Sequence, residues 1–323
     1  MSRSFEGLLE EIRQASVITL FRHENPDCDA VGSQLGLKTW LEENFPEKKV
    51  YALGNESISS PEWPKPDHVD DAVVRSSLAI VLDTPDIARV DDHRFLSAAS
   101  IVKIDHHPLV DSYAKLEFVY TDAAATCEIL ADFFQQMETQ ENLVFSRSAA
   151  EYIFSGLLTD TLSFKTTNTT PHTLATGAYI ASKGISIPEL WHGVFDVSLH
   201  EFQFAGFIRS QAQFAGNHTV YVVVSREDMS RWNMAPGDAR SFVSQFMGVR
   251  EIECWAVFTE KTGEDGSVLF DGSLRSAHVQ LNDLAANYHG GGHRNACGVK
   301  NLSYEDLKQL LGQMSERAEA YLS

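Results

Sequence analysis

Features of membrane-spanning and secreted proteins are missing from this sequence of 323 residues. No apolar run reaches the roughly 18 residues that a spanning helix needs, so we predict no transmembrane segment and no membrane partner. The N-terminus lacks the apolar core of a secretory signal, so we expect a cytoplasmic location. The cysteines form no C-x-x-C pair and match no zinc-site spacing, which predicts reduced thiols. They are Cys28, Cys127, Cys254 and Cys297.

Cationic residues are also scarce. Lysine and arginine number 26 against 45 aspartates and glutamates, which is a formal net charge of −19. Binding along a nucleic-acid backbone needs many lysine and arginine contacts, so we predict no long duplex nucleic acid as a partner. A short, highly charged substrate is compatible with this charge if local cations, bound metal included, offset the negative field.

Apolar residues make up 43% of the chain and charged residues 22%, which predicts a folded protein of one large or two ordinary domains. In the first part, apolar strand candidates alternate with helical patterns, which indicates a parallel sheet covered on both faces. The strand candidates are residues 16–21, 49–53, 78–82, 100–104, 217–224, 252–258 and 267–275. The helix candidates are residues 4–15, 29–43, 124–138, 147–158, 171–183, 186–194, 199–212, 281–288 and 304–320.

These patterns predict an α/β protein of two domains. Residues 1–198 are expected to form a Rossmann-like domain around the parallel sheet. Residues 199–323, with a connecting helix at 199–212, are expected to form a smaller α/β domain with a mixed sheet. Asp265-Gly266 is predicted to be the turn of a β-hairpin in the second domain.

Clusters of aspartate and histidine follow three of the predicted strands and close one predicted helix. The clusters are His23-x-x-x-Asp27-x-Asp29, Asp83, Asp105-His106-His107 and Asp160. Ligands of open α/β sheets bind beyond the carboxyl ends of the strands. We therefore expect these side chains to converge there.

Most of these residues also have a plain structural explanation. Asp27 or Asp29 alone could be the N-cap of an ordinary helix. Asp83 or Asp160 alone could be a turn or cap residue. We predict that Asp86 caps the turn that follows Asp83, and we leave it outside the site.

The triplet Asp105-His106-His107 is harder to explain as a polar turn. Adjacent side chains point in different directions, so the two imidazoles should have different roles. One can bind metal while the other faces the substrate. Asp105 could orient an imidazole by accepting its second N–H, which is the usual arrangement around metal-binding histidines.

Together the clusters supply carboxylates and imidazoles for a centre with more than one metal ion. Without cations, the carboxylates would repel one another and several of their pKa values would rise. Oxygen and imidazole donors without thiolate favour Mn²⁺ or Mg²⁺, with Co²⁺ as a further candidate. Two such ions, about 3.5–4 Å apart, would bind a phosphoryl group and activate water for in-line attack on phosphorus.

In this order, the clusters resemble the DHH phosphoesterase superfamily, which is named for the triplet seen at residues 105–107. Two later segments resemble the signature of its DHHA1 domain: Gly272-Ser273-Leu274-Arg275-Ser276 and Gly290-Gly291-Gly292-His293. In size and layout the chain is most similar to the stand-alone nanoRNase type of bifunctional oligoribonuclease and 3′-phosphoadenosine-5′-phosphate (PAP) phosphatase. Cys28 stands where the family commonly has glycine, which removes no proposed ligand.

The resemblance implies two manganese ions in the first domain. One ion would be held by His23, Asp27 and Asp83, and the other by Asp29, Asp83, His106 and Asp160. Asp83 would bridge them, and His107 would contact the scissile phosphate. We predict catalytic roles for His107, Asp105 and Asp83.

The resemblance also implies that the second domain binds the phosphates of the substrate. The predicted contacts are Ser273, Arg275, Gly290, Gly291, Gly292 and His293. Taken by themselves, three successive glycines could form either a nest of N–H donors for an anion or a flexible linker. The helical pattern before them and the apolar Val299 after them favour the nest.

We therefore predict a manganese-dependent hydrolase of short oligonucleotides, linear dinucleotides or PAP. Its expected partners are short RNA, dinucleotides and nucleoside bisphosphates, while the oligomeric state stays open, a homodimer included. A pyrophosphatase or polyphosphatase is the first alternative, but such enzymes have a different second domain, without the glycine-rich His293 motif. A catalytically inactive nucleotide sensor is the second, and it would bind dinucleotides without turnover.

Overall fold

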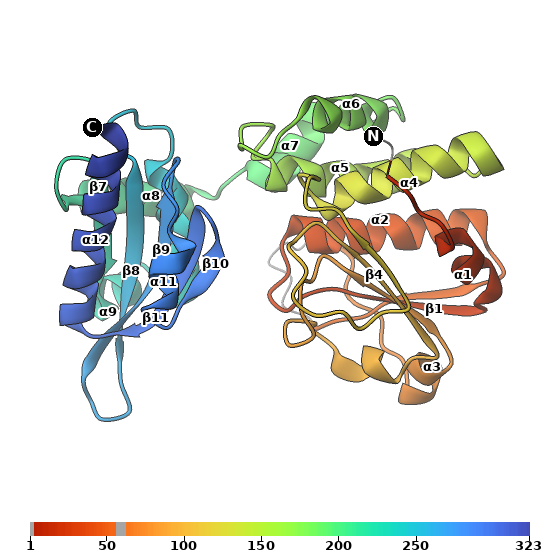
Figure 1. Ribbon diagram of the computed structural model, residues 1–323, viewed down its shortest axis with the longest axis horizontal. Helices are drawn as coiled ribbons and strands as arrows, with labels where there is room; N and C mark the ends of the chain where they lie inside the picture. The colour runs from red at the N-terminus through yellow and green to blue at the C-terminus, as the bar shows by residue number, and fades with distance from the viewer. Residues whose placement is uncertain (1–2, 56–62) are drawn as a thin grey trace. The chain divides into compact units, whose positions relative to one another are not determined.

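The computed structural model describes residues 3–55 and 63–323 (Figure 1). The chain divides into two compact units, one ending at Asp196 and the other beginning at Val197. The boundary predicted from the sequence was 198/199. Each unit has its own sheet and its own hydrophobic core.

The first unit is built on a five-stranded sheet in the order β2-β1-β3-β4-β5. All of its neighbouring strands are parallel, as the sequence predicted. The strands are β1 (Val17–Phe21), β2 (Lys49–Ala52), β3 (Leu78–Leu82), β4 (Ser100–Asp105) and β5 (Leu116–Val119). The edge strand β5 was not predicted, because four residues with a charge in second place give little periodic signal.

Helices cover the two faces of this sheet unequally. The larger core lies between the sheet and α1, α2, α4 and α5, while α3 and the 3₁₀-helix η1 contribute to a smaller core on the opposite face (Figure 1). The long helices are therefore gathered on one side of the sheet. The helices are α1 (Leu8–Gln14), α2 (Cys28–Asn44), α3 (Asp71–Arg75), η1 (His93–Ser97), α4 (Thr126–Glu141), α5 (Arg147–Asp160), α6 (Pro171–Ala181) and α7 (Ile187–Phe195).

Glycines allow α2 and α5 to approach closely. A Cβ atom at Gly32 of α2 would lie 2.6 Å from the carbonyl oxygen of Tyr152 on α5. A Cβ atom at Gly156 of α5 would meet the sulfur of Cys127 and would lie 3.0 Å from the Cα of Asp29. This close packing brings the first turn of α2 against the last turns of α5.

The second unit is built on a six-stranded mixed sheet in the order β10-β11-β9-β8-β7-β6. Only β7 and β8 pair in parallel. The strands are β6 (Gln213–Phe214), β7 (Thr219–Val224), β8 (Cys254–Thr262), β9 (Val268–Ser276), β10 (Gly291–His293) and β11 (Ala296–Leu302). The predicted fold class, a parallel-sheet domain followed by a mixed-sheet α/β domain, is confirmed.

Both faces of the second sheet carry a core. One core includes residues of α11 and α12, and the other includes residues of α8, α9, α10 and the 3₁₀-helix η2. The helices are α8 (Leu199–Ser210), α9 (Arg226–Arg231), α10 (Pro236–Ser241), η2 (Phe242–Phe246), α11 (Asn282–Ala286) and α12 (Tyr304–Leu322). The predicted turn joins β8 to β9: the N–H of Gly263 donates to the carbonyl of Ser267 at 2.8 Å, and Gly266 has a φ of 83°.

Across residues 3–55 and 63–323, no helix is both long enough and apolar enough to cross a bilayer.

We predict that Gly156→Ala lowers the free energy of unfolding of the protein by about 1–3 kcal/mol, because the added methyl group would overlap the sulfur of Cys127. Urea denaturation followed by circular dichroism would measure the change. Gly193→Ala is the matched control, since Gly193 lies in α7 with no atom within 4 Å of the added methyl group. Equal stability of the two variants would contradict the close packing of α2 and α5.

Candidate metal centre

Three strand ends that carry acidic or histidine clusters are neighbours in the first sheet. β1, β3 and β4 lie side by side, and because they are parallel their carboxyl ends meet at one edge. Backbone contacts join the loops that follow. The N–H of Glu24 donates to the carbonyl of Arg89 at 2.8 Å, and the N–H of Asp83 donates to that of Ile104 at 3.0 Å.

The loop between β1 and α2 places His23 beside Asp27. Asp27 is the N-cap of α2, and its Oδ1 accepts hydrogen bonds from the N–H groups of Asp29 and Ala30, each at 3.0 Å. Its other oxygen lies 3.8 Å from Nε2 of His23. Nδ1 of His23 lies 2.8 Å from the carbonyl of Glu24 and must donate to it, because a carbonyl cannot donate. Nε2 is then the nitrogen that can bind a metal.

Asp83 lies at the centre of the cluster. It directly follows β3, is 1% exposed, and has a φ of 56°, a left-handed conformation that is uncommon for residues other than glycine. One carboxylate oxygen lies 3.4 Å from Nε2 of His106, and the other lies 3.5 Å from Nε2 of His23. The hydroxyl of Thr126 donates to Asp83 at 3.0 Å. Asp83 therefore joins the histidines of two different loops.

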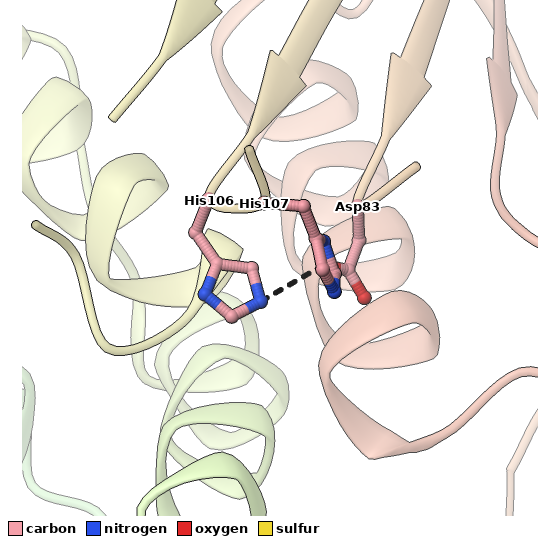
Figure 2. A group of neighbouring side chains, drawn as sticks. All are labelled: Asp83, His106 and His107. Atoms are coloured by element: carbon pink, nitrogen blue, oxygen red, sulfur yellow. Dashed lines mark ion pairs between the residues drawn. The ribbon is translucent and has the colours of Figure 1, made fainter. Parts of the chain in front are cut away.

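The two histidines of the triplet at the end of β4 have different partners. Figure 2 shows the side chains of His106 and His107 beside Asp83, just beyond the ends of β4 and β3. Nε2 of His106 lies 3.4 Å from an oxygen of Asp160. Nδ1 of His107 lies 2.8 Å from Oδ1 of Asp105, which also accepts the backbone N–H of His107 at 3.1 Å. Asp105 therefore contacts the imidazole of His107, and its role in orienting that ring stays a prediction.

Two further carboxylates reach the same place from helices. Asp160 is the last residue of α5, and Asp29 lies in the first turn of α2. The carboxylate of Asp29 accepts hydrogen bonds from the N–H groups of Thr126, at 2.7 Å, and Cys127, at 2.9 Å. These N–H groups begin α4, so the N-terminus of a 16-residue helix stabilises this anion.

The structure brings together every residue that we predicted as a metal ligand. Three overlapping groups each offer ligand atoms that lie within 4.8 Å of one another. The groups are His23, Asp27 and Asp83; Asp29, His106 and Asp160; and Asp83, His106 and His107. Asp83 belongs to two of them, as a bridging ligand would. Cys28 belongs to none.

The carboxylates strongly influence one another. Burial raises the pKa values of Asp29 and Asp160 well above their ordinary value, and the charges of neighbouring aspartates add to the effect. Burial would also raise the pKa of Asp83. The close pairing with His23 and the charges of the histidines of the triplet instead lower the pKa of Asp83. Such a site gains stability from bound cations, because they offset the repulsion.

The histidines differ in their protonation. Burial would lower the pKa of His23, but its pairing with Asp27 and Asp83 raises it to about 10. Burial lowers the pKa of His106. Burial also acts to lower the pKa of His107, but the hydrogen bond with Asp105 outweighs it and raises the pKa. A metal ion would displace the proton from Nε2 of His23, whereas His106 already favours the neutral form that binds metal.

The chemistry of this donor set fits hard divalent ions. Buried carboxylate oxygens and imidazole nitrogens converge, and no thiol takes part in the groups described. These are the ligands that favour Mn²⁺ and Mg²⁺ over metals that prefer sulfur.

The sequence did not predict that Thr126 belongs to this centre. Its side chain is fully buried, its hydroxyl binds Asp83, and its backbone N–H binds Asp29. The helical pattern near residue 124 indicated a helix N-terminus there. It could not indicate which carboxylates that N-terminus would meet.

In the second unit, strand register gathers the residues that we predicted to bind substrate. Arg275 of β9 and His293 of β10 both pair with Ala296 of the strand between them. Ser273 is linked in the same way through Gly298 to Gly291. Paired residues in neighbouring strands place their side chains on the same face of a sheet. Arg275 and His293 therefore share one face.

The glycine triplet belongs to a hairpin and is not a flexible linker, because Gly291 and Gly292 lie in β10 and Gly290 directly precedes it. Gly291 and Gly292 pair with β11, and Gly292 has a φ of 134°. A Cβ atom at Gly290 would overlap the carbonyl of Gly298, and one at Gly292 would lie 2.5 Å from that of Ala296. The tight β10–β11 hairpin therefore accounts for Gly290 and Gly292. Contacts between these glycines and a substrate stay predictions.

Arg275 provides a positive charge on this face of the sheet. Its Nη1 donates to the carbonyl of Leu274 at 2.9 Å, and burial lowers the pKa of its guanidinium. It forms no ion pair with any carboxylate in the part of the chain that the structure describes. A half-buried guanidinium without an acidic partner is suited to binding an anion.

Comparisons with known proteins agree with both units. The sequence profile of the N-terminal domain of the DHH family matches residues 17–157, and that of the DHHA1 domain matches residues 217–320. A Bacillus subtilis (strain 168) protein, the bifunctional oligoribonuclease and PAP phosphatase NrnA, is 31% identical over 307 residues, which is 95% of this chain and 96% of that protein. A probable bifunctional oligoribonuclease and PAP phosphatase NrnA from Streptococcus mutans is 30% identical over 315 residues, which is 95% of this chain and 99% of that protein.

A solved structure shows the same fold. An exopolyphosphatase-related protein from Bacteroides fragilis matches with a TM-score of 0.85 at 21% identity, over 98% of this chain and 96% of that chain. The matched domains, their order and the near-complete coverage agree with the resemblance seen in the sequence motifs. The chain therefore belongs to the DHH family of phosphoesterases, with a DHH domain followed by a DHHA1 domain.

Proposed function

We propose that this protein is a manganese-dependent phosphoesterase that hydrolyses short oligonucleotides, linear dinucleotides or PAP by two-metal in-line attack of water. The convergence of three overlapping ligand groups, two of which contain Asp83, is the observation that carries the proposal. The two NrnA proteins, each matched over 95% of this chain, are named for oligoribonuclease and PAP phosphatase activity, which supports the same substrate class.

Two ions would share the centre through Asp83. His23, Asp27 and Asp83 would hold one ion, and Asp29, Asp83, His106 and Asp160 would hold the other. When bound, the ions supply activation of water and neutralisation of the charge that develops on the phosphoryl group. The raised pKa values of Asp29 and Asp160 support this arrangement, because such carboxylates need nearby positive charge.

His107 would contact the scissile phosphate. Asp105 accepts the hydrogen bond from Nδ1 of His107, so Nδ1 carries a proton and Nε2 is the atom that would meet the substrate. With its pKa raised, His107 can donate a hydrogen bond to a phosphoryl oxygen. Asp105 fixes the direction of the ring, which is the role of a positioning residue.

The DHHA1 domain would hold the end of the substrate away from the bond that breaks. Arg275 and His293 on one face of the sheet would bind phosphate, with Ser273 nearby. The net charge of −19 opposes long polyanions, whereas a ligand of a few nucleotides needs only a few such cations. This balance supports a substrate a few nucleotides long.

A turnover panel with the full-length protein tests this function. We expect hydrolysis of RNA of two to about five nucleotides and of PAP in the presence of Mn²⁺, with little hydrolysis of pyrophosphate or polyphosphate. Chromatography of the products would measure each rate. Processive degradation of long strands, or a preference for pyrophosphate, would contradict the proposed substrate class, and tight dinucleotide binding without turnover would indicate a sensor.

We predict that Asp83→Asn lowers kcat by about 100-fold or more and weakens the binding of Mn²⁺, because both proposed metal sites use this carboxylate. Steady-state kinetics and isothermal titration calorimetry would measure the two effects. Asp86→Asn is the control from the same loop, since Asp86 caps the turn at Arg89 with a 2.9 Å hydrogen bond and joins none of the groups. Near-native turnover by Asp83→Asn would refute the two-ion centre.

The raised pKa of His23 predicts how metal and pH act together on stability. A histidine whose pKa rises from 6.5 to about 10 on folding contributes its full stability below pH 6.5 and loses it as the pH rises toward 10. The raised pKa values of Asp29 and Asp160 act in the same direction. In EDTA, we therefore expect Tm to fall between pH 6.5 and 8.5.

Mn²⁺ should raise Tm more at pH 8.5 than at pH 6.5, because fewer protons then compete for Nε2 of His23. Differential scanning fluorimetry in EDTA and in Mn²⁺ would measure both changes. A gain from Mn²⁺ that shrinks as the pH rises would contradict the assignment of His23 as a ligand.

A further inference from the structure

Lys103 is a fully buried lysine in β4, the strand that ends at the candidate metal centre. It lies in β4 two residues before Asp105, so the two side chains emerge on the same face of the strand. Lysine is almost never fully buried without a partner, because removing an ammonium from water is costly. The partners of Lys103 therefore show what its charge does.

The ammonium of Lys103 is held in place by three neighbours. It donates a hydrogen bond to the carbonyl oxygen of Pro85 at 2.8 Å. It lies 3.5 Å from Oδ2 of Asp105 and 5.3 Å from the centre of the Tyr113 ring. Pro85 follows Asp83 by two residues, so this one side chain contacts both the loop after β3 and the end of β4.

The two oxygens of Asp105 have different partners. Oδ1 accepts the backbone N–H and the Nδ1–H of His107. Oδ2 is buried and accepts no hydrogen bond from the described residues, which leaves the ammonium of Lys103 as the charge beside it. Without Lys103, Oδ2 would be a buried, unpaired anionic oxygen, and the carboxylate would gain by turning away from its present position.

We propose that Lys103 is a positioning residue for the phosphoesterase reaction, which holds the carboxylate of Asp105 in the orientation that directs His107. This inference rests on the proposed function and adds a third member to the Asp105–His107 pair. Lys103 itself joins none of the ligand groups. Its effect should therefore fall on the step that uses His107 and not on the binding of metal.

The first test is Lys103→Met, which keeps the length and packing of the side chain and removes its charge. We expect kcat to fall about 10- to 100-fold, the range typical of outer-shell partners of metal-binding residues. KM for the dinucleotide and Kd for Mn²⁺ should stay within about threefold of the wild-type values. Steady-state kinetics and isothermal titration calorimetry would measure them.

Lys183→Met is the matched control. Lys183 is partly buried, and its ammonium lies 2.6 Å from an oxygen of Glu138 and 4.5 Å from the centre of the Tyr179 ring. Its partner Glu138 lies in the last turn of α4, 12 residues from Thr126 and roughly 18 Å along the helix axis. This variant loses the same kinds of contact away from the centre, so its kcat should be unchanged.

A double-mutant cycle with His107→Ala separates positioning from a general loss of structure. If Lys103 acts through Asp105 and His107, Lys103→Met should reduce kcat by less than about threefold once His107 is alanine. An equal loss in both backgrounds would overturn the proposal, as would a loss explained by weaker Mn²⁺ binding.

Folding and function can be distinguished in the same experiment. Lys103→Gln keeps an N–H donor without the charge and replaces Lys103→Met in the cycle if the methionine variant does not fold. If neither variant folds, Lys103 serves the fold and the proposal is rejected. An inactive wild-type protein would instead count against the proposed function, because the cycle compares the kcat of each variant with that of the wild-type protein.

Discussion

The mutual repulsion of buried carboxylates is the constraint on which this structure depends. Asp83, Asp29 and Asp105 are almost completely buried and lie at one edge of the first sheet. Each is held by a different kind of positive partner. Histidines from two loops and the hydroxyl of Thr126 surround Asp83, the N-terminus of α4 binds Asp29, and the ammonium of Lys103 lies beside Asp105. The protein keeps its anions close together because each has a local partner, and this leaves oxygen atoms available to divalent ions.

The fold meets this constraint through two features. Because β1, β3 and β4 are parallel neighbours, their carboxyl ends lie side by side and the three loops that follow them begin at one edge of the sheet. Close packing of α2 against α5 then brings Asp29 and Asp160 to that edge from the helical side, because Gly32 and Gly156 carry no side chain. Asp83 lies where the strand ends and the helices come together, and its left-handed φ is a strained backbone conformation. In the second unit, strand register brings the predicted substrate-binding residues together, because Arg275 and His293 pair on either side of Ala296.

Much of this organisation was predictable because its signals are local. Apolar strand segments, helical periodicity and the spacing of His23, Asp27 and Asp29 can all be recognised over a few residues, and they indicated the fold class and the candidate ligands. Strands β5, β6, β10 and β11 were not among the strand candidates, since strands of two to four residues and a segment rich in glycine have no clear strand pattern. The glycine triplet was interpreted as an anion nest for the same reason. Its pairing with β11 is a feature of the folded structure that the local sequence does not indicate.

The sequence by itself determined which groups this protein has for chemistry, their order along the chain, and the strands and helices that carry the aspartate and histidine clusters of the first domain. Only the tertiary structure decided which of them meet. Thr126 binds Asp83 across 43 residues and Asp29 across 97, and Lys103 reaches Pro85 across 18. Those partnerships depend on strand order, on the distance between helices and on the direction in which a buried side chain points. None of these is a property of a short segment, because each arises from the packing of segments that are far apart in the chain.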